Sequence, residues 1–199
     1  FTTTVQKRDG TYHRQNQVDH YVPKALYPWF ALSLNNFIPS CANCNHKKSD
    51  SDNLVLYPYE EGFGNAYRFH SVPISGIGYL IGQAATDDEF EIEIEPSPDA
   101  ADRKLDYHER VENSRNLFGL DELYRNSHNS FVAGIYEQRY IFGDAYIQSL
   151  QDSFGEMFRY ETDIRKLLYL RDIDENAWDE SPLAKLTHDI DEEITRLSR

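Results

Sequence analysis

Cysteine is scarce in this chain, and long hydrophobic runs are missing. The 199 residues contain two cysteines, Cys41 and Cys44, which excludes a secreted scaffold held together by several disulfides. No stretch is apolar enough to predict a membrane span, and none has the pattern of a signal peptide. We therefore expect no membrane association and a cytoplasmic location. Residue 1 is Phe1 and the single methionine is Met157, so we expect the natural start of the chain to lie upstream.

Basic residues are also in short supply, with 20 Lys and Arg against 34 Asp and Glu, a formal net charge of −14. Taken alone, this balance argues against a nucleic-acid enzyme, because an acidic surface repels phosphates. The charge is uneven, however. Residues 1–50 contain six basic and three acidic residues, a net +3, which leaves −17 for the remainder. The first segment can face phosphates. The acidic remainder indicates that something else grips the nucleic acid, or that this part binds a basic partner.

The composition is typical of a folded protein, since hydrophobic residues make up 40% of the chain and aromatic residues 14%. Residues 1–22 predict a β-hairpin with a turn at Arg8-Asp9-Gly10 and a second strand over 13–19 that ends near His20. Residues 21–40 predict an ordered loop with one helical turn. A helix is expected to start around Ser40–Cys44 and to carry residues 45–48.

The rest of the chain changes from β to helical patterns. Phe90, Ile92 and Ile94 alternate with glutamates, which predicts a strand with one acidic, solvated face. From residue 101 onward the pattern is helical, and helices are expected near 121–140, 143–158, 160–171 and 182–198. The predicted fold class is α+β in three parts: residues 1–60, a β or irregular segment 61–100, and a mostly α-helical region 101–199 that we expect to bind a partner.

Asp19 and His20 are adjacent at the expected end of a strand and give the first indication of chemistry. A carboxylate is a hard oxygen ligand suited to Mg²⁺ or Mn²⁺. An imidazole can take a proton from water near neutral pH. Side chains alternate in direction along a strand, so one residue can hold a metal while the other faces the nucleophile.

Two asparagines fit the same chemistry. Asn45 lies at an expected helix start, where its amide oxygen could reach the metal of Asp19; helix capping is the alternative, because Asn is a favoured N-cap. Asn36 lies in the intervening loop, where its amide can bond to the backbone and fix the orientation of the imidazole.

Three lysines accompany these residues. Lys47 and Lys48 follow near the electropositive start of the helix, which favours phosphate oxygens. Together with Lys24 they either contact phosphate or only improve solubility. The whole set suits metal-dependent hydrolysis of a phosphodiester, with His20 activating the attacking water.

The segment resembles the HNH endonuclease family, also called ββα-metal nucleases. The resemblance covers residues 1–60 and depends on Asp19-His20, on Asn36-Phe37-Ile38-Pro39, and on Cys41-Ala42-Asn43-Cys44-Asn45 with Lys48 close behind. It implies an N-terminal ββα-metal module. It also implies that His20 is the general base, that Asp19 and Asn45 bind the catalytic metal, and that Asn36 positions the base.

Many relatives of this type carry an earlier Cys-x-x-Cys that completes a structural zinc site with the later pair. The resemblance therefore implies zinc binding by Cys41 and Cys44, provided that an upstream cysteine pair exists. Two thiols alone are half of the four ligands that zinc needs. Without the upstream pair, Cys41 and Cys44 would be two reduced thiols or a weak site.

A looser resemblance links the chain to HNH proteins encoded beside SMC/ABC-like ATPases. It depends on residues 27–41, on Asn116-Leu117-Phe118-Gly119-Leu120, and on Tyr124-Arg125-Asn126-Ser127-His128. Such pairs belong to Septu-type and retron-associated anti-phage systems of bacteria, where the ATPase regulates the HNH subunit. The resemblance implies a bacterial nuclease, most simply of DNA, with an ATPase partner. An RNA-cleaving nuclease and a non-catalytic, zinc-stabilised adaptor are the alternatives.

Overall fold

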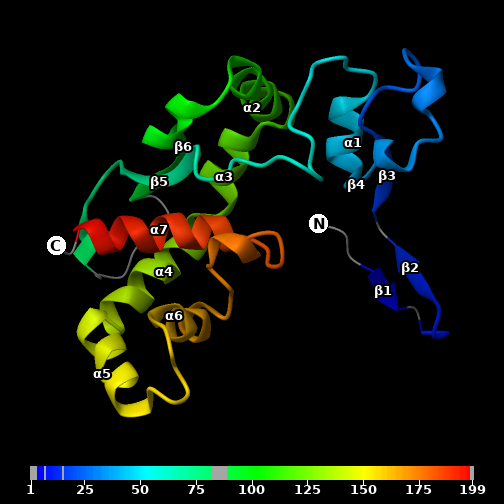
Figure 1. The fold of residues 1–199 in the computed structure, drawn as a ribbon. Helices are drawn as coiled ribbons and strands as arrows, with labels where there is room; N and C mark the ends of the chain where they lie inside the picture. Colours follow the sequence, from blue (N-terminus) through cyan, green and yellow to red (C-terminus); the bar gives the residue numbers. More distant parts are fainter. Residues whose placement is uncertain (1–3, 7, 15, 82–88, 198–199) are drawn as a thin grey trace. The chain divides into compact units, whose positions relative to one another are not determined.

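The computed structural model describes residues 4–6, 8–14, 16–81 and 89–197 (Figure 1). The chain divides into two compact units, each made of two separate segments. Unit 1 combines Phe1–Gly64 with Ala101–Leu120, and unit 2 combines Asn65–Ala100 with Asp121–Arg199. The division into 1–60, 61–100 and 101–199 stays a prediction. No helix of the described part is long and apolar enough to cross a membrane.

Unit 1 begins with the predicted hairpin. Strands β1 (Thr4–Gln6) and β2 (Tyr12–Arg14) pair antiparallel. Asp9 closes the turn by accepting hydrogen bonds from the backbone N–H and the hydroxyl of Thr11 at 2.9 and 2.6 Å. Gly10 has a φ of +81°, a conformation that favours glycine. The hairpin and its turn are therefore confirmed.

The strand that carries Asp19 and His20 pairs differently from the prediction. Strand β3 (Gln17–His20) is separate from β2 and pairs antiparallel with β4 (Phe37–Ser40), with His20 opposite Phe37. The expectation of one continuous strand over 13–19 was wrong. A backbone hydrogen bond of 2.9 Å from Tyr21 to the carbonyl of Asn36 extends this pairing into the loop and explains the choice of partner.

The loop between β3 and β4 is shorter than the predicted range 21–40, because residues 37–40 form strand β4 and pair with β3. The loop contains two short 3₁₀ turns, Pro28–Phe30 and Leu34–Asn36. Helix α1 (Ala42–Lys48) begins after Cys41, whose sulfur accepts a hydrogen bond from the backbone N–H of Cys44 at 3.3 Å. The predicted helix carrying residues 45–48 is confirmed.

Helix α2 (Leu105–Phe118) holds the segment after α1 in place. Arg110 forms a two-pronged ion pair with Glu61, at 2.9 and 2.5 Å. Ser114 accepts a hydrogen bond of 2.9 Å from the backbone of Leu56. The buried apolar side chains of unit 1, within the described part, are Pro23, Val55, Tyr107 and Val111. So small a core makes these polar clamps important for stability.

Unit 2 is built around a two-stranded sheet and helices. Strand β5 (Tyr67–Pro73) pairs antiparallel with β6 (Phe90–Pro96), whose apolar residues Phe90, Ile92 and Ile94 are buried, so the predicted alternating strand is confirmed. Helix α7 (Ala184–Leu197) lies between this sheet and α4 (Asn129–Ile141) in Figure 1.

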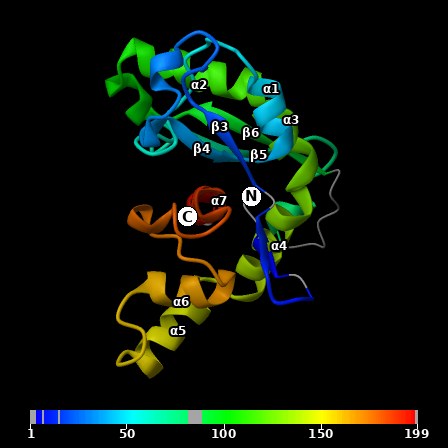
Figure 2. The same cartoon turned by 90° about the vertical axis from the view of Figure 1, so that its right-hand side faces the viewer.

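The other helices of unit 2 partly match the prediction. The helix expected near 121–140 is two helices, α3 (Leu120–Ser127) and α4, because the chain breaks its helical conformation at His128. Helices α5 (Asp144–Phe154) and α6 (Glu161–Tyr169) lie side by side (Figure 2), and both fall within predicted ranges.

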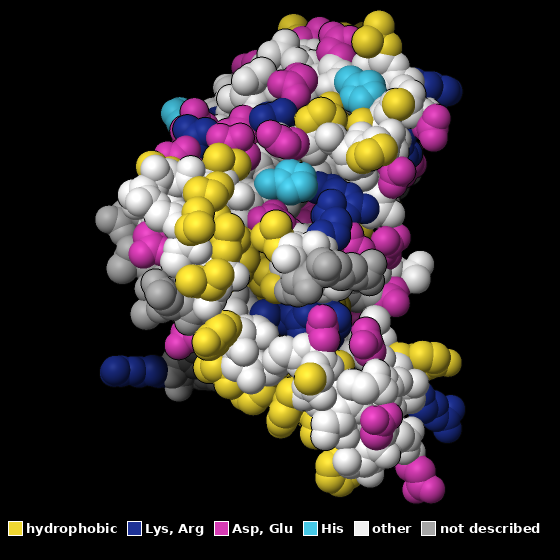
Figure 3. Space-filling view, turned by 90° about the vertical axis from the view of Figure 1, so that its left-hand side faces the viewer, with side chains coloured by type: hydrophobic (Ala, Val, Ile, Leu, Met, Phe, Trp, Pro, Cys, Tyr) yellow, Lys and Arg dark blue, Asp and Glu magenta, His cyan; other side chains and the backbone are white. Residues whose placement is uncertain are grey.

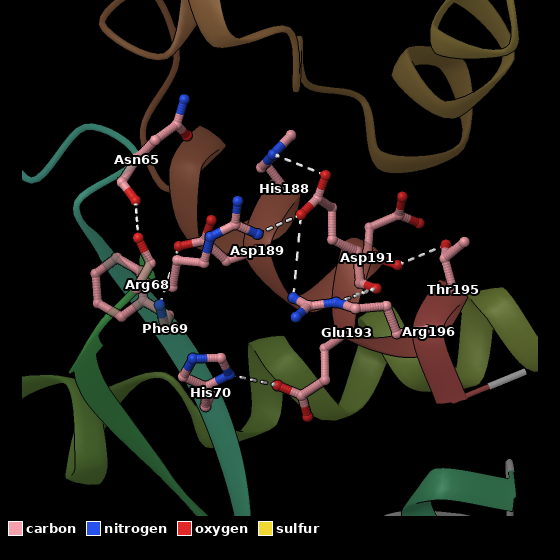
Figure 4. A network of polar contacts seen from close by, with 12 residues as sticks. Asn65, Arg68, Phe69, His70, His188, Asp189, Asp191, Glu193, Thr195 and Arg196 are labelled. Atoms are coloured by element: carbon pink, nitrogen blue, oxygen red, sulfur yellow. Dashed lines mark hydrogen bonds and ion pairs between the residues drawn. The ribbon is translucent and has the colours of Figure 1, made fainter. Parts of the chain in front are cut away.

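Carboxylates of α7 cover the free edge of β5 (Figure 4). Asp189 accepts a hydrogen bond from the backbone N–H of Phe69 at 3.0 Å, and Glu193 accepts one from Ser71 at 3.2 Å. The two acids are one helical turn apart, and the two N–H groups alternate along the strand, so helix and strand match in spacing. Two N–H groups of this edge thereby have acceptors without a third strand.

The His70–Glu193 pair predicts a pH-dependent stability of unit 2. The hydrogen bond to Glu193 raises the pKa of His70. Burial alone would raise the pKa of Glu193, but hydrogen bonds from His70, Ser71 and Tyr136 lower it. A raised histidine pKa stabilises the fold below the unfolded value of about 6.5, and this contribution is lost as pH rises through the folded pKa. A lowered glutamate pKa stabilises the fold above the unfolded value of about 4.3, and this contribution is lost as pH falls through the folded pKa.

We therefore expect His70→Gln to lower the urea midpoint of unit 2 more at pH 5.5 than at pH 8. Trp178 fluorescence in a Trp29→Phe background reports on unit 2, because the chain has two tryptophans, one in each unit. If His70→Gln lowers the urea midpoint by the same amount at both pH values, protonated His70 does not stabilise the fold.

Candidate active site

Asp19 and His20 open onto one cleft of unit 1. The cleft has a volume of about 660 Å³ and is also lined by Lys24, Asn45 and His46. Strand β3, the start of the following loop and helix α1 each supply part of this lining. The structure thus brings together four of the residues predicted to carry chemistry: Asp19, His20, Lys24 and Asn45.

The imidazole of His20 is held on two sides. Its Nε2 lies 3.1 Å from the carbonyl oxygen of Ala31, and its ring packs edge-on against Phe37 with 5.2 Å between the ring centres. A carbonyl oxygen only accepts hydrogen bonds, so Nε2 carries the hydrogen. In the neutral ring the lone pair is then on Nδ1, which is the form that a general base requires.

Asn36 is buried and clamps the loop that supplies this carbonyl. Its side-chain oxygen accepts a hydrogen bond from the backbone N–H of Val22 at 2.6 Å. Its NH₂ group donates to the carbonyls of Val22 at 3.1 Å and Phe30 at 3.2 Å. Phe30 directly precedes Ala31, so Asn36 acts on His20 through the backbone rather than by touching the imidazole.

Lys48 is buried beneath the Asp19-His20 pair. Its ammonium lies 3.4 Å from the Asp19 carboxylate and donates a hydrogen bond of 2.5 Å to the backbone carbonyl of His20. The Lys48 side chain is only 4% exposed. This ammonium therefore points into unit 1, toward the acid and the backbone of β3, instead of outward as expected for a phosphate contact.

Asn45 is positioned by Gln17 on the neighbouring strand. The Asn45 NH₂ group donates a hydrogen bond of 2.7 Å to the Gln17 side-chain oxygen. This bond leaves the amide oxygen, the atom that binds a hard cation, out of the contact. Cys41, and not Asn45, occupies the N-cap of α1. The capping role considered for Asn45 is therefore wrong.

The donor set of the cleft fits a magnesium or manganese ion. Mg²⁺ is commonly held by one or two carboxylates together with waters and substrate phosphate. Asp19 supplies one carboxylate and Asn45 one amide oxygen on the same cleft. In the described ranges, no three or more His, Cys, Asp and Glu side chains gather as a metal cluster. A tight, all-protein cage is thus not part of this site.

The two cysteines do not by themselves fit a structural zinc ion. Cys41 and Cys44 are free thiols. The hydrogen bonds of Cys44 lower the pKa of the Cys41 thiol, whereas burial raises the pKa of the Cys44 thiol. Zinc needs four ligands, and the described residues add no acidic, histidine or cysteine cluster here. The upstream cysteine pair on which the zinc prediction depends is not part of this sequence.

The other two predicted lysines differ in their surroundings. Lys24 is exposed and lines the cleft. Lys47 is exposed as well, and its ammonium donates a hydrogen bond of 2.9 Å to the carbonyl of Phe118, at the C-terminal end of α2. A cation is favoured there by the helix dipole.

Comparison with known proteins agrees with this geometry. Residues 6–51 match the model of the HNH endonuclease family. This segment contains β3, the loop, β4 and α1, and thus every residue assigned to the cleft above. No curated protein and no solved structure matches the chain. Residues 6–51 are thus similar to an HNH endonuclease domain, and the segment is called the HNH domain below for that similarity. Members of this family generally depend on divalent metal ions.

Sequence reasoning missed several groups that hold the HNH domain together. The carbonyl of Ala31 has no side-chain signal that could have identified it. The hydroxyls of Tyr57 and Tyr59 donate hydrogen bonds to the carbonyls of Asn35 and Phe37, at 2.6 and 2.8 Å. These bonds tie the segment after α1 to the loop and to β4, and nothing in the sequence pattern distinguishes the two tyrosines from surface aromatics.

The burial of Lys48 predicts a large effect on the stability of unit 1. Removing one partner of a buried ion pair leaves a buried charge unbalanced and costs about 3–5 kcal/mol. We expect Lys48→Met to lower the free energy of unfolding by this order. Urea unfolding followed by Trp29 fluorescence in a Trp178→Phe background measures it.

The matched control is Lys104→Met, an exposed lysine of unit 1 that precedes α2. A double variant with Asp19→Leu and Lys48→Met should recover part of the loss, because both buried charges are then absent. Equal unfolding free energies for Lys48→Met and Lys104→Met would contradict the role of the ion pair.

Proposed function

We propose that the chain is a metal-dependent endonuclease that hydrolyses phosphodiester bonds of DNA. The observation that carries this proposal is the cleft of the HNH domain, onto which Asp19, His20 and Asn45 all open. A base, two oxygen ligands for a hard cation and an exposed Lys24 are the groups that phosphodiester hydrolysis needs.

His20 acts as the general base. The hydrogen bond of its Nε2 to Ala31 keeps the lone pair on Nδ1, so the ring can accept a proton from a water molecule poised to attack phosphorus. Packing against Phe37 limits rotation of the ring. The imidazole therefore needs little reorganisation when the proton moves.

Asp19 and Asn45 are the residues that would hold a Mg²⁺ or Mn²⁺ ion, through one carboxylate and one amide oxygen. Such an ion, when bound, polarises the scissile phosphate and stabilises the departing 3′ oxygen. Lys48 keeps the Asp19 carboxylate in place from the buried side. Lys24 is exposed at the cleft and is the lysine placed for phosphate contact, whereas Lys47 would have to leave the carbonyl of Phe118 to make one.

A partner subunit is the second element of the proposal. Unit 1 has ten basic and ten acidic residues, whereas unit 2 has ten basic and 24 acidic ones, so unit 2 carries the whole net charge of −14. Such a unit repels nucleic acid and a second copy of itself, and attracts a basic protein surface. This charge supports a basic protein partner. The looser resemblance to HNH proteins encoded beside SMC/ABC-like ATPases supplies its identity, and we propose on that basis that such an ATPase binds unit 2 and regulates the nuclease in anti-phage defence.

Helix α5 provides an exposed apolar stripe for such a partner. Tyr146, Phe154 and the following Met157 are 44%, 53% and 72% exposed, and Ile147 is the one residue of α5 that is fully buried. Tyr146, Leu150 and Phe154 recur every four residues, which puts them on one face of the helix. Hydrophobic and acidic side chains lie interspersed at the surface in the view of Figure 3.

The first test is cleavage of plasmid DNA with Mg²⁺ or Mn²⁺ by the wild type and by His20→Ala. Removal of a general base lowers rates by about 10²–10⁴-fold. We expect this loss in His20→Ala without a change in the urea midpoint. The control is His108→Ala on α2, which lies outside the cleft. Equal cleavage by wild type and His20→Ala would reject the mechanism.

The alternatives have their own outcomes in the same assay. Cleavage of RNA but not of DNA by the wild type, abolished in His20→Ala, would replace DNA by RNA as the substrate. No cleavage of either polymer by a folded protein, with and without the ATPase, would favour a non-catalytic adaptor.

The partner is tested by looking for an SMC/ABC-like ATPase among the proteins that co-purify with the tagged chain from its own host. We expect the double variant Tyr146→Ser and Phe154→Ser to lose the complex while its DNA cleavage in isolation stays at the wild-type level. Leu105→Ser is the control, because Leu105 is an exposed leucine of unit 1. A complex that survives the double variant would contradict docking on α5.

A further inference from the structure

The loop between β3 and β4 exposes several large apolar side chains. Trp29, Leu32 and Leu34 are 71%, 89% and 82% exposed. Leu26 and Phe30 are also exposed. Single apolar residues at a surface are ordinary, but five within nine positions of one loop indicate a surface that meets a ligand.

The loop is built to hold these side chains outward. Its start is closed by backbone hydrogen bonds of 3.1 and 2.9 Å from Leu26 and Tyr27 to the carbonyl of Pro23. Its end is closed by the buried amide of Asn36. Tyr27 also supports Trp29 by an edge-on ring contact, with 6.0 Å between the ring centres. The exposed apolar groups therefore belong to a defined conformation.

The same loop is part of the catalytic arrangement. Pro23 and Lys24, at its start, line the cleft that holds His20. The carbonyl of Ala31 binds His20, and Ala31 lies between Trp29 and Leu32 in the chain. A polymer bound in the cleft therefore runs past the first residues of this loop.

Charge favours a nucleic acid over a protein as the occupant. Asp19 is the sole acidic residue between Asp9 and Asp50, although the chain has 34 acidic residues. Lys24 and Lys47 are exposed in the same stretch. Asp50 also lines the cleft, and Asp52 accepts a hydrogen bond of 3.4 Å from Tyr27. Residues 20–49 themselves contain no acidic residue, so a polyanion meets less repulsion at this loop than at unit 2, where a basic protein partner finds the negative charge it needs.

We infer, on the basis of the nuclease function proposed above, that Trp29 and Leu32 form an apolar wedge that packs against DNA bases beside the scissile phosphate. Aromatic side chains stack on bases of any sequence, and apolar side chains can separate neighbouring base pairs. Inserting the wedge requires a base step to open. The nuclease therefore prefers sites that unstack easily, such as mismatches and flexible pyrimidine–purine steps.

The test compares three DNA probes: a short duplex, the same duplex with one internal mismatch, and its single strand. Binding is measured in the full chain with His20→Ala, which prevents cleavage, and Trp178→Phe, which leaves Trp29 as the fluorophore. We expect DNA to quench Trp29. The affinity of the variants is measured by the anisotropy of labelled DNA. We expect Trp29→Ala to weaken binding of the intact duplex about 10-fold or more. The same substitution should weaken binding of the mismatched duplex clearly less.

Cleavage by otherwise wild-type protein gives the second readout. Trp29→Ala and Leu32→Ser should lower the cleavage rate on the intact duplex, and the rate should return toward the wild-type value on the mismatched duplex. Trp29→Phe should retain most of the activity. Leu105→Ser, a leucine of unit 1 that is 84% exposed, should change neither rate. Recovery on the mismatch separates a wedge from a merely structural role, which would affect all probes equally.

Three outcomes would overturn the inference. The first is that DNA does not quench Trp29 fluorescence. The second is that the variants lose the same factor in affinity on all three probes. The third is that the variants bind DNA normally but change in self-association, which would make the loop a protein interface. If the wild type cleaves DNA in these cases, the proposed nuclease function still stands. A further outcome is that DNA quenches Trp29, and Trp29→Ala weakens binding of the mismatched duplex less than of the intact one, while neither the wild type nor any variant cleaves. In that case the wedge stands and the nuclease function fails.

Discussion

The ammonium of Lys48 is the contact on which the HNH domain depends. It joins helix α1 to strand β3 by reaching both the Asp19 carboxylate and the backbone carbonyl of His20. A carboxylate at the floor of a cleft repels substrate phosphate, and a buried lysine offsets that charge without occupying the cleft. The bond to the His20 carbonyl fixes the backbone from which the imidazole projects, so one cation positions both the proposed metal ligand, Asp19, and the proposed base, His20.

The surrounding structure replaces a large hydrophobic core by side chains that bind backbone. Asn36, Tyr57 and Tyr59 each contact main-chain groups of the loop or of β4. Such bonds are directional, whereas burial of apolar area is not. A domain with few buried apolar side chains can therefore still hold its catalytic groups in register, and helix α2 adds the ion pair of Arg110 with Glu61 that closes the unit.

Local patterns predicted the parts of this structure that depend on neighbours in sequence. The turn at residues 8–10, helix α1 and the alternating strand β6 follow from glycine conformation, capping and side-chain period. Local patterns did not predict that β3 pairs with β4, or that residues 101–120 belong to unit 1. Both features depend on contacts between distant segments, which single-sequence periodicity does not contain.

The site shows the same division. Residue type and spacing were enough to propose Asp19, His20, Asn36 and Asn45, because metal and proton chemistry demand those groups. They were not enough to separate a buried lysine from a surface one: Lys47 and Lys48 are adjacent and chemically identical, yet the helix directs one to Phe118 and the other to Asp19. Burial decides between these roles, and burial is a property of the fold.

The distribution of charge limits how this domain can hold a nucleic acid. Each neutralised phosphate contributes about 0.9 to the salt dependence of binding to duplex DNA, and the proteins that bind tightly through charge make roughly 6–10 such contacts. The cleft offers far fewer cations, since Lys48 is buried, Lys47 binds the carbonyl of Phe118, and Lys24 is the exposed lysine that lines it. Electrostatic attraction by the HNH domain is therefore weak, and unit 2 opposes it. Under the proposed function, the apolar side chains of the loop and the proposed basic partner supply the remaining affinity, and such a partner would then control cleavage through DNA binding.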